Sequence, residues 1–124
     1  MGYTVLIVED EPIVALELKE TLIQHGYKVP EVATTADGVL EAFNRVKPAL
    51  VLMDINLRSY TDGVDAAHRL GLFDDAPVVF LTGNRDPHVE KRARATSNSY
   101  YVQKPFDEDR LIELLDQILS GSGE

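Results

Sequence analysis

The chain of 124 residues contains no cysteine, and its apolar runs all fall short of the roughly 18 residues that a membrane-spanning helix needs. The first absence excludes disulfides and thiolate chemistry, and it fits a reducing compartment. The second predicts a chain without a membrane span. The first four residues also carry no basic leader segment, so we expect a cytoplasmic protein.

Basic residues are scarce as well. Twelve lysines and arginines stand against 21 aspartates and glutamates, which gives a formal net charge of −9. A surface of this sign repels nucleic acid phosphates, so we expect no direct binding of DNA or RNA. The apolar fraction of 44% is sufficient for a core, and the length fits one domain. We predict a domain over residues 1–120 and a flexible tail over 121–124.

Short β-branched runs alternate with longer amphipathic segments along the chain. The predicted strands are 4–8, 28–32, 49–53, 77–81 and 100–103, and the predicted helices are 12–25, 37–46, 64–70, 87–95 and 107–119. The first, third and fourth strands are apolar throughout, which indicates central parallel strands covered on both faces. Five β–α units with right-handed crossovers predict an α/β fold, a three-layer doubly wound parallel sheet of five strands in the order 2-1-3-4-5.

Local signals mark several element ends. Gly26 suits the end of the first helix, and Pro30 places its strand at a sheet edge because proline cannot donate a ladder hydrogen bond. Thr35 or Asp37 is the expected cap of the second helix, and Asp107 that of the last. The helix residues expected to face the core are Val14, Leu18, Leu22, Val39, Leu40, Phe43, Leu111, Leu114, Leu115 and Ile118.

Polar side chains stand at the C-terminal ends of four predicted strands. Asp54 closes the third, Glu9 and Asp10 follow the first, Thr82 follows the fourth, and Lys104 follows the fifth. Open α/β sheets place their chemistry at this edge, and the topological switch point opens between the first and third strands. Carboxylates, a hydroxyl and an ammonium meeting there suit the binding of a divalent cation and the transfer of a phosphoryl group.

Four motifs, in order at strand ends, carry a family resemblance. They are Ile7-Val8-Glu9-Asp10-Glu11, Leu52-Met53-Asp54-Ile55-Asn56, Phe80-Leu81-Thr82-Gly83 and Gln103-Lys104-Pro105-Phe106. With them the chain resembles the receiver domain of bacterial two-component response regulators, of the chemotaxis-regulator, flavodoxin-like kind, over residues 5–119. The resemblance implies a phospho-accepting switch rather than a metabolic enzyme. A histidine kinase or phosphotransfer protein would donate the phosphoryl group, and a downstream protein effector would read the result.

The resemblance also implies roles for the carboxylates. Asp54 would be the phosphoacceptor, because a carboxylate attacking phosphorus gives an acyl phosphate. Glu9, Asp10 and Asp54 would hold Mg²⁺, together with the main-chain carbonyl of Asn56. Mg²⁺ prefers hard oxygen ligands and keeps several waters, so two or three carboxylates are enough.

Lys104 would place its ammonium on a phosphoryl oxygen, and the family pattern implies a cis Lys104–Pro105 bond. Thr82 would hydrogen-bond another phosphoryl oxygen and act as a switch together with Tyr101, whose ring turns inward when Thr82 moves toward the phosphate. A homodimer through the face made by the fourth helix, the fifth strand and the last helix is a further expectation of the resemblance.

The sequence departs from the family pattern at three places. Arg58 stands where many receivers carry proline, and Asn98 and Tyr100 replace a proline and a glycine of one subgroup, which puts the turn before the last strand in question. These departures leave the five strand-end site residues unchanged.

Alternative functions stay open at this point. A haloacid-type Mg²⁺-dependent phosphatase also has an aspartate nucleophile after a strand, but it usually carries a second aspartate two residues on, where this chain has Asn56. A flavodoxin-like binding module needs a phosphate-cradling loop where this chain has acidic residues. A pseudo-receiver adaptor would not need an intact site. The sequence does not separate a stand-alone receiver from one cut out of a larger protein.

Overall fold

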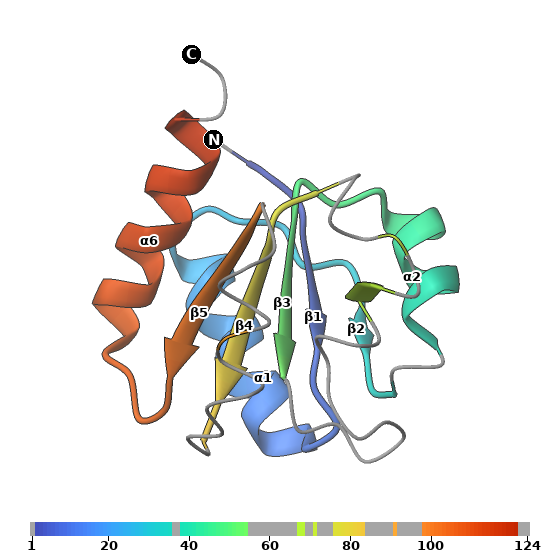
Figure 1. Ribbon diagram of the computed structural model, residues 1–124, viewed down its shortest axis with the longest axis horizontal. Helices are drawn as coiled ribbons and strands as arrows, with labels where there is room; N and C mark the ends of the chain where they lie inside the picture. The colour runs from blue at the N-terminus through green and yellow to red at the C-terminus, as the bar shows by residue number, and fades with distance from the viewer. Residues whose placement is uncertain are drawn as a thin grey trace.

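The computed structural model describes residues 2–35, 38–54, 67–68, 71, 76–83, 91 and 98–121. Within them lies a five-stranded sheet in the order β2-β1-β3-β4-β5, with every neighbouring pair parallel (Figure 1). This confirms the predicted fold class and strand order. None of the helices within those ranges is long and apolar enough to cross a membrane.

Three strands form the buried centre of the sheet: β1 (Val5–Val8), β3 (Leu50–Asp54) and β4 (Val78–Thr82). Every residue in them is buried, as expected for parallel strands covered on both faces. β3 and β4 each run one residue further than predicted, so Asp54 and Thr82 are the last residues of their strands. The edge strand β5 (Ser99–Gln103) is less buried.

Side chains alternate between the two faces of the sheet and build two core layers. On one face, helices α1 (Pro12–Gln24) and α6 (Glu108–Gly121) cover Val5, Ile7, Leu50, Leu52, Val79 and Leu81. On the other face, α2 (Val39–Val46) contributes to a cluster with Leu6, Val8, Val51, Met53, Val78 and Phe80. The two layers hold the central strands rigidly, so their C-terminal ends are fixed relative to one another.

The second strand differs from its prediction. β2 covers only Val32–Ala33, and the predicted stretch 28–32 is reduced to an isolated bridge between Lys28 and Thr4 before it. Pro30 lies between the bridge and the strand, and its missing N–H interrupts the ladder there. The predicted edge position is confirmed, because β2 stands at one end of the described strand order, next to β1.

Helix ends follow the local sequence signals. Proline opens α1 at its first turn, and Gly26 after the helix takes a φ of 91°, which side chains other than glycine rarely adopt. Asp107 caps α6, since its Oδ1 accepts a hydrogen bond of 2.9 Å from the Asp109 N–H. α6 continues through Gly121, two residues beyond the predicted end.

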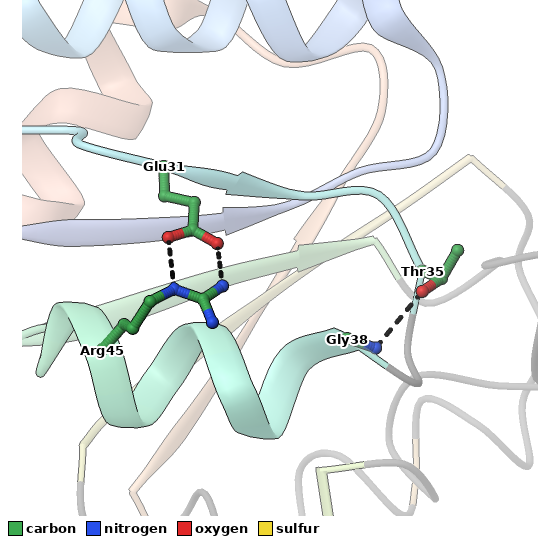
Figure 2. Close-up of polar contacts among 4 residues, drawn as sticks. All are labelled: Glu31, Thr35, Gly38 and Arg45. Carbon is green, nitrogen blue, oxygen red and sulfur yellow. Dashed lines mark hydrogen bonds and ion pairs between the residues drawn. The ribbon is translucent and has the colours of Figure 1, made fainter.

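Two polar contacts hold α2 against the edge of the sheet (Figure 2). The Arg45 guanidinium donates two hydrogen bonds to the Glu31 carboxylate just before β2, and the Gly38 N–H donates to Thr35 Oγ1 over 3.2 Å. Of the two expected caps, Thr35 therefore contacts the start of this helix, and Asp37 lies outside the described residues. The prediction that Leu40 faces inward was wrong, because its side chain is exposed while its neighbours Val39, Ala42 and Phe43 are buried.

Of the two predicted helices over 64–70 and 87–95, the structure describes only Ala67, His68 and Lys91, all three in helical conformation. The other residues of these helices lie outside the described part of the chain. The turn before β5 is described at Asn98, which has a φ of 66°. The φ angle of proline is fixed near −65°. The asparagine found at this position is therefore compatible with the turn, whereas a proline is not.

Candidate functional site

The sheet brings the predicted site residues to one edge. Val8 is paired with Met53 across β1 and β3, so Glu9 and Asp54 both follow directly from that pair. Asp54 is in turn paired with Leu81, and Thr82 comes one residue later at the end of β4. Glu9, Asp54 and Thr82 are all buried, which is unusual for two acids and a hydroxyl at strand ends.

Three carboxylates gather at the ends of β1 and β3. Glu9, Asp10 and Asp54 each offer one oxygen, and these oxygens all lie within 4.8 Å of one another. The Glu11 N–H donates a hydrogen bond of 3.1 Å to Glu9 Oε2, whereas the buried Glu9 Oε1 accepts none from the described part of the chain. A buried carboxylate oxygen in this position, facing two further carboxylates, fits a hard divalent cation such as Mg²⁺.

Burial and charge change the acidity of this cluster. Burial raises the pKa of Glu9 from 4.5 to about 7, the N–H of Glu11 opposes this rise, and the negative charge of Asp54 adds to it. The cluster therefore holds a proton on Glu9 at a pH where an exposed glutamate is ionised. A bound cation and this proton compete for the same carboxylate.

The ammonium of Lys104 reaches the same cluster from the end of β5. Its Nζ lies 3.8 Å from Asp54 Oδ2 and 3.9 Å from Glu9 Oε1. These distances are too long for direct hydrogen bonds, but the positive charge of Lys104 opposes the rise in the pKa of Glu9. The Lys104–Pro105 peptide bond is cis, as the resemblance implies.

The main chain couples Lys104 to Thr82. The Lys104 N–H donates a hydrogen bond of 2.6 Å to the Thr82 carbonyl, immediately beyond the Thr82–Gln103 pair of β4 and β5. The ammonium and the hydroxyl therefore stand on neighbouring strand ends that are hydrogen-bonded to each other. Gly83 adds little steric restriction, because a Cβ built on it would stay 4.0 Å from Lys104 Cδ.

Tyr101 lies on the same sheet face as Phe80, the residue with which it is paired. Its ring packs against the core cluster on that face, and its hydroxyl oxygen is buried. The ring of Tyr101 therefore lies in an inward position in this structure.

The structure thus brings together Glu9, Asp10, Asp54 and Lys104, with Thr82 at the adjacent strand end. Asn56, the predicted main-chain ligand, lies outside the described residues. Sequence reasoning missed the main-chain contribution of Glu11, whose N–H fixes one oxygen of Glu9. The sequence did contain a signal for this contact, because a short acidic turn directly before a helix directs main-chain N–H groups at nearby carboxylates.

Comparison with known proteins identifies the family. The family model of the response regulator receiver domain matches residues 5–116. The transcriptional regulatory protein PdtaR of Mycobacterium tuberculosis is 34% identical over 116 residues, which are 94% of this chain and 56% of PdtaR. The chain therefore spans about half the length of such curated relatives. The chemotaxis protein CheY of Thermotoga maritima is 28% identical, and the match covers 95% of this chain and 98% of CheY.

A solved structure agrees with this fold along the whole length. The signal receiver domain of a modulated diguanylate cyclase from Desulfovibrio desulfuricans superposes with a TM-score of 0.85 at 30% identity, covering 98% of this chain and 96% of that one. The fold, the strand-end carboxylates and the family match all point the same way. The chain belongs to the response regulator receiver domain family, and it is a phospho-accepting switch of two-component signalling.

Proposed function

We propose that Asp54 is the residue that accepts the phosphoryl group. The observation that carries this proposal is the position of its carboxylate, buried at the end of β3 with two other carboxylates within 4.8 Å and an ammonium 3.8 Å away. A buried carboxylate with an acidic cluster and a lysine beside it is a candidate for a role in chemistry. The donor would be a phosphohistidine on a histidine kinase or a phosphotransfer protein.

The transfer requires one bond to form and one to break. An oxygen of Asp54 attacks phosphorus, the bond between phosphorus and the donor imidazole nitrogen breaks, and that nitrogen keeps the electron pair. Lys104 lies where its ammonium stabilises the negative charge on a phosphoryl oxygen, and the Thr82 hydroxyl would donate to another. Water later cleaves the acyl phosphate, which resets the switch.

The carboxylates Glu9, Asp10 and Asp54 would hold Mg²⁺, with the main-chain carbonyl of Asn56 as a further expected ligand. When bound, the ion offsets the repulsion between the acidic cluster and the incoming phosphate. The three oxygens within 4.8 Å of one another and the buried Oε1 of Glu9 support this assignment. The chain itself supplies the geometry, because two adjacent strands fix Glu9 and Asp54 before any cation arrives.

The chemistry proposed here serves regulation and not metabolic turnover. The second aspartate that a haloacid-type phosphatase uses two residues after its nucleophile is Asn56 in this chain, and the intact acidic site disfavours a pseudo-receiver. The partner face would comprise the predicted helix over 87–95, β5 and α6, and a homodimer would form through the same face. The cysteine-free composition supports a cytoplasmic location for such a switch.

Intact mass spectrometry after incubation with acetyl phosphate and Mg²⁺ tests the proposal. The chain should gain the mass of one phosphoryl group, and Asp54→Asn should abolish that gain because the nucleophile is gone. The matched control is Asp107→Asn, which alters an exposed aspartate at the cap of α6. Full labelling of Asp54→Asn, or loss of labelling in the control alone, would contradict the assignment.

A further inference from the structure

A cavity lies at the end of the sheet opposite Asp54. Its volume is about 400 Å³, within the roughly 300–1,000 Å³ of small-molecule sites. Three separate segments meet around it: the residues that lead into β1, the turn after α1, and the last turn of α6. In Figure 1 this is the upper end of the molecule, near the start of β1 and the end of α6, whereas the strand arrowheads point to the Asp54 edge.

The lining of this cavity combines aromatic rings with one fixed carboxylate. The residues around it are Gly2, Tyr3, His25, Gly26, Tyr27, Asp116, Leu119 and Ser120. The buried Tyr27 donates its hydroxyl proton to Asp116 Oδ1, which fixes the carboxylate and leaves Oδ2 for a second donor. Ser120 Oγ donates to the Asp116 carbonyl over 2.6 Å, so the last turn of α6 is held as well.

The electrostatics of this lining favour a cation. Among the described residues that line it, Asp116 is the one acidic residue, and none is a lysine or an arginine. α1 and α6 both end at the cavity, and neither has a basic residue in its last turn. Helix C-termini carry partial negative charge, so two helix ends and one carboxylate act on the same space. Lys28 lies beside Gly2 at the border of this lining, and its Cε would be 3.6 Å from a Cβ built on that glycine.

We propose that this cavity is a binding site for a small organic cation that carries an aromatic or apolar body, such as an arylalkylamine. The ammonium would pair with Asp116 Oδ2, and the body would lie against Tyr3, Tyr27 and Leu119. Tyrosine rings suit both parts of such a ligand, because their faces attract cations and their edges bury apolar surface. Anions of similar size, including nucleotides, would be repelled by the same groups.

The test is a titration of the ¹⁵N-labelled full chain, followed by NMR, with three probes of similar shape: phenethylammonium, 2-phenylethanol and phenylacetate. The cation should shift the amide signals of Tyr3, Tyr27 and Leu119 with a saturating curve. The alcohol should bind about tenfold more weakly, because it lacks the charge that Asp116 pairs with, and the anion should not bind. Equal affinities for the cation and the alcohol would overturn the proposal.

Three variants make the test specific to the cavity. Asp116→Asn keeps the side-chain volume and an acceptor for Tyr27. It should weaken the binding of phenethylammonium about tenfold, because the charge is removed. Glu113→Gln removes an exposed charge from the same helix outside the lining, and it should leave the affinity unchanged. Tyr27→Phe keeps the aromatic ring and leaves Asp116 in place. Its affinity for phenethylammonium should therefore stay within a factor of about three of the parent chain, because the phenol hydroxyl is not needed for binding.

Three further outcomes would reject this binding site. If Asp116→Asn and Glu113→Gln weaken binding equally, the amine responds only to the overall charge of −9 and the proposal fails. If shifts cluster around Glu9 and Asp10, the cation is drawn to the acidic site instead, and the proposal also fails. Binding of a lysine-rich peptide with no binding of phenethylammonium would identify a protein surface and reject the small-molecule site.

Discussion

Lys104 Nζ lies 3.8 Å from Asp54 Oδ2 although their strands are not neighbours. β4 separates β3 from β5, so the lysine side chain crosses the end of a whole strand to reach the aspartate. The ammonium thus balances charge inside the acidic cluster. It also competes there with any divalent cation for the same oxygens.

Replacing Lys104 by methionine should separate these two effects. We expect phosphorylation by acetyl phosphate to slow about 100-fold, because a charged donor to the developing anion is lost. Mg²⁺ should bind at least as tightly as before, since a competing positive charge has been removed from within 4 Å of two carboxylates. Labelling kinetics by mass spectrometry and Mg²⁺ titration check the two parts. Weaker Mg²⁺ binding would show that the lysine supports the metal site.

Mg²⁺ should stabilise the folded chain, because the cluster of three carboxylates exists only in the folded state. At about 100 times its Kd the ion adds about 2.7 kcal/mol to the free energy of unfolding. For a domain of this size that corresponds to a rise in Tm of about 10 °C. Asp10→Asn should lose most of this response, and Glu11→Gln, which alters the exposed neighbour outside the cluster, should keep it. Scanning calorimetry with Mg²⁺ and with EDTA measures the difference.

The pKa of Glu9 predicts how stability depends on pH in the absence of metal. Its folded-state value of about 7 exceeds the ordinary 4.5, so the folded chain binds the extra proton between these pH values. The free energy of unfolding should therefore fall as pH rises from about 4.5 to 7, by at most about 3 kcal/mol from this group. Glu9→Gln should remove this part of the slope.

Urea unfolding at pH 5.5 and at pH 8, with EDTA, isolates this contribution as the difference between the parent chain and Glu9→Gln. Stabilisation by Mg²⁺ should be larger at pH 8, where the carboxylate is already deprotonated. An identical pH slope in both proteins would mean that Glu9 does not control it.

Thr82 should carry the signal from the phosphate to β5, because its hydroxyl would donate to a phosphoryl oxygen while its main chain is hydrogen-bonded to Lys104 and paired with Gln103. Beryllofluoride with Mg²⁺, which mimics a phosphoryl group, should shift NMR signals along β5 and α6 in the parent chain. In Thr82→Ala the shifts should stay confined to the residues around Asp54. The exposed Thr34→Ala is the matched control.

The same NMR measurement on a Tyr101 variant tests whether the ring or its hydroxyl transmits the change. Its ring already packs inward here, so Tyr101→Phe should retain the shifts along β5 if ring position alone transmits the change. Loss of the shifts in Tyr101→Phe would assign the coupling to the phenol hydroxyl. Unchanged shifts in Thr82→Ala would move the coupling to another path, with the turn at Asn98 as the first candidate.

The sequence was sufficient for the centre of the fold and for most of the site. β1, β3 and β4 are continuous apolar runs, a composition typical of parallel strands buried on both faces. Each is followed by polar residues, so parallel pairing alone brings Glu9, Asp54 and Thr82 to one edge. The strand register then places these residues level with one another, because Val8 is paired with Met53 and Asp54 with Leu81.

Features that depend on tertiary contacts were predicted less well. The β-branched residues around Pro30 favour a strand, yet the missing N–H reduces the pairing to one bridge and two residues. Leu40 and Val39 are adjacent apolar residues about 100° apart on a helix, and only the roll of α2 against the sheet decides which one is buried. The reach of Lys104 across β4 likewise depends on side-chain conformation, which periodicity does not encode.

The first and the last described segments of the chain lie beside the same cavity. Gly2 and Tyr3 border the same cavity as Leu119 and Ser120, at the end of the sheet away from Asp54. A fluorophore, an affinity tag or a fused domain attached at either terminus would therefore sit remote from the phosphorylation edge. Two fluorophores, one at each terminus, would stay close together for as long as the sheet is intact. Their energy transfer would report unfolding directly, without a label near the chemistry.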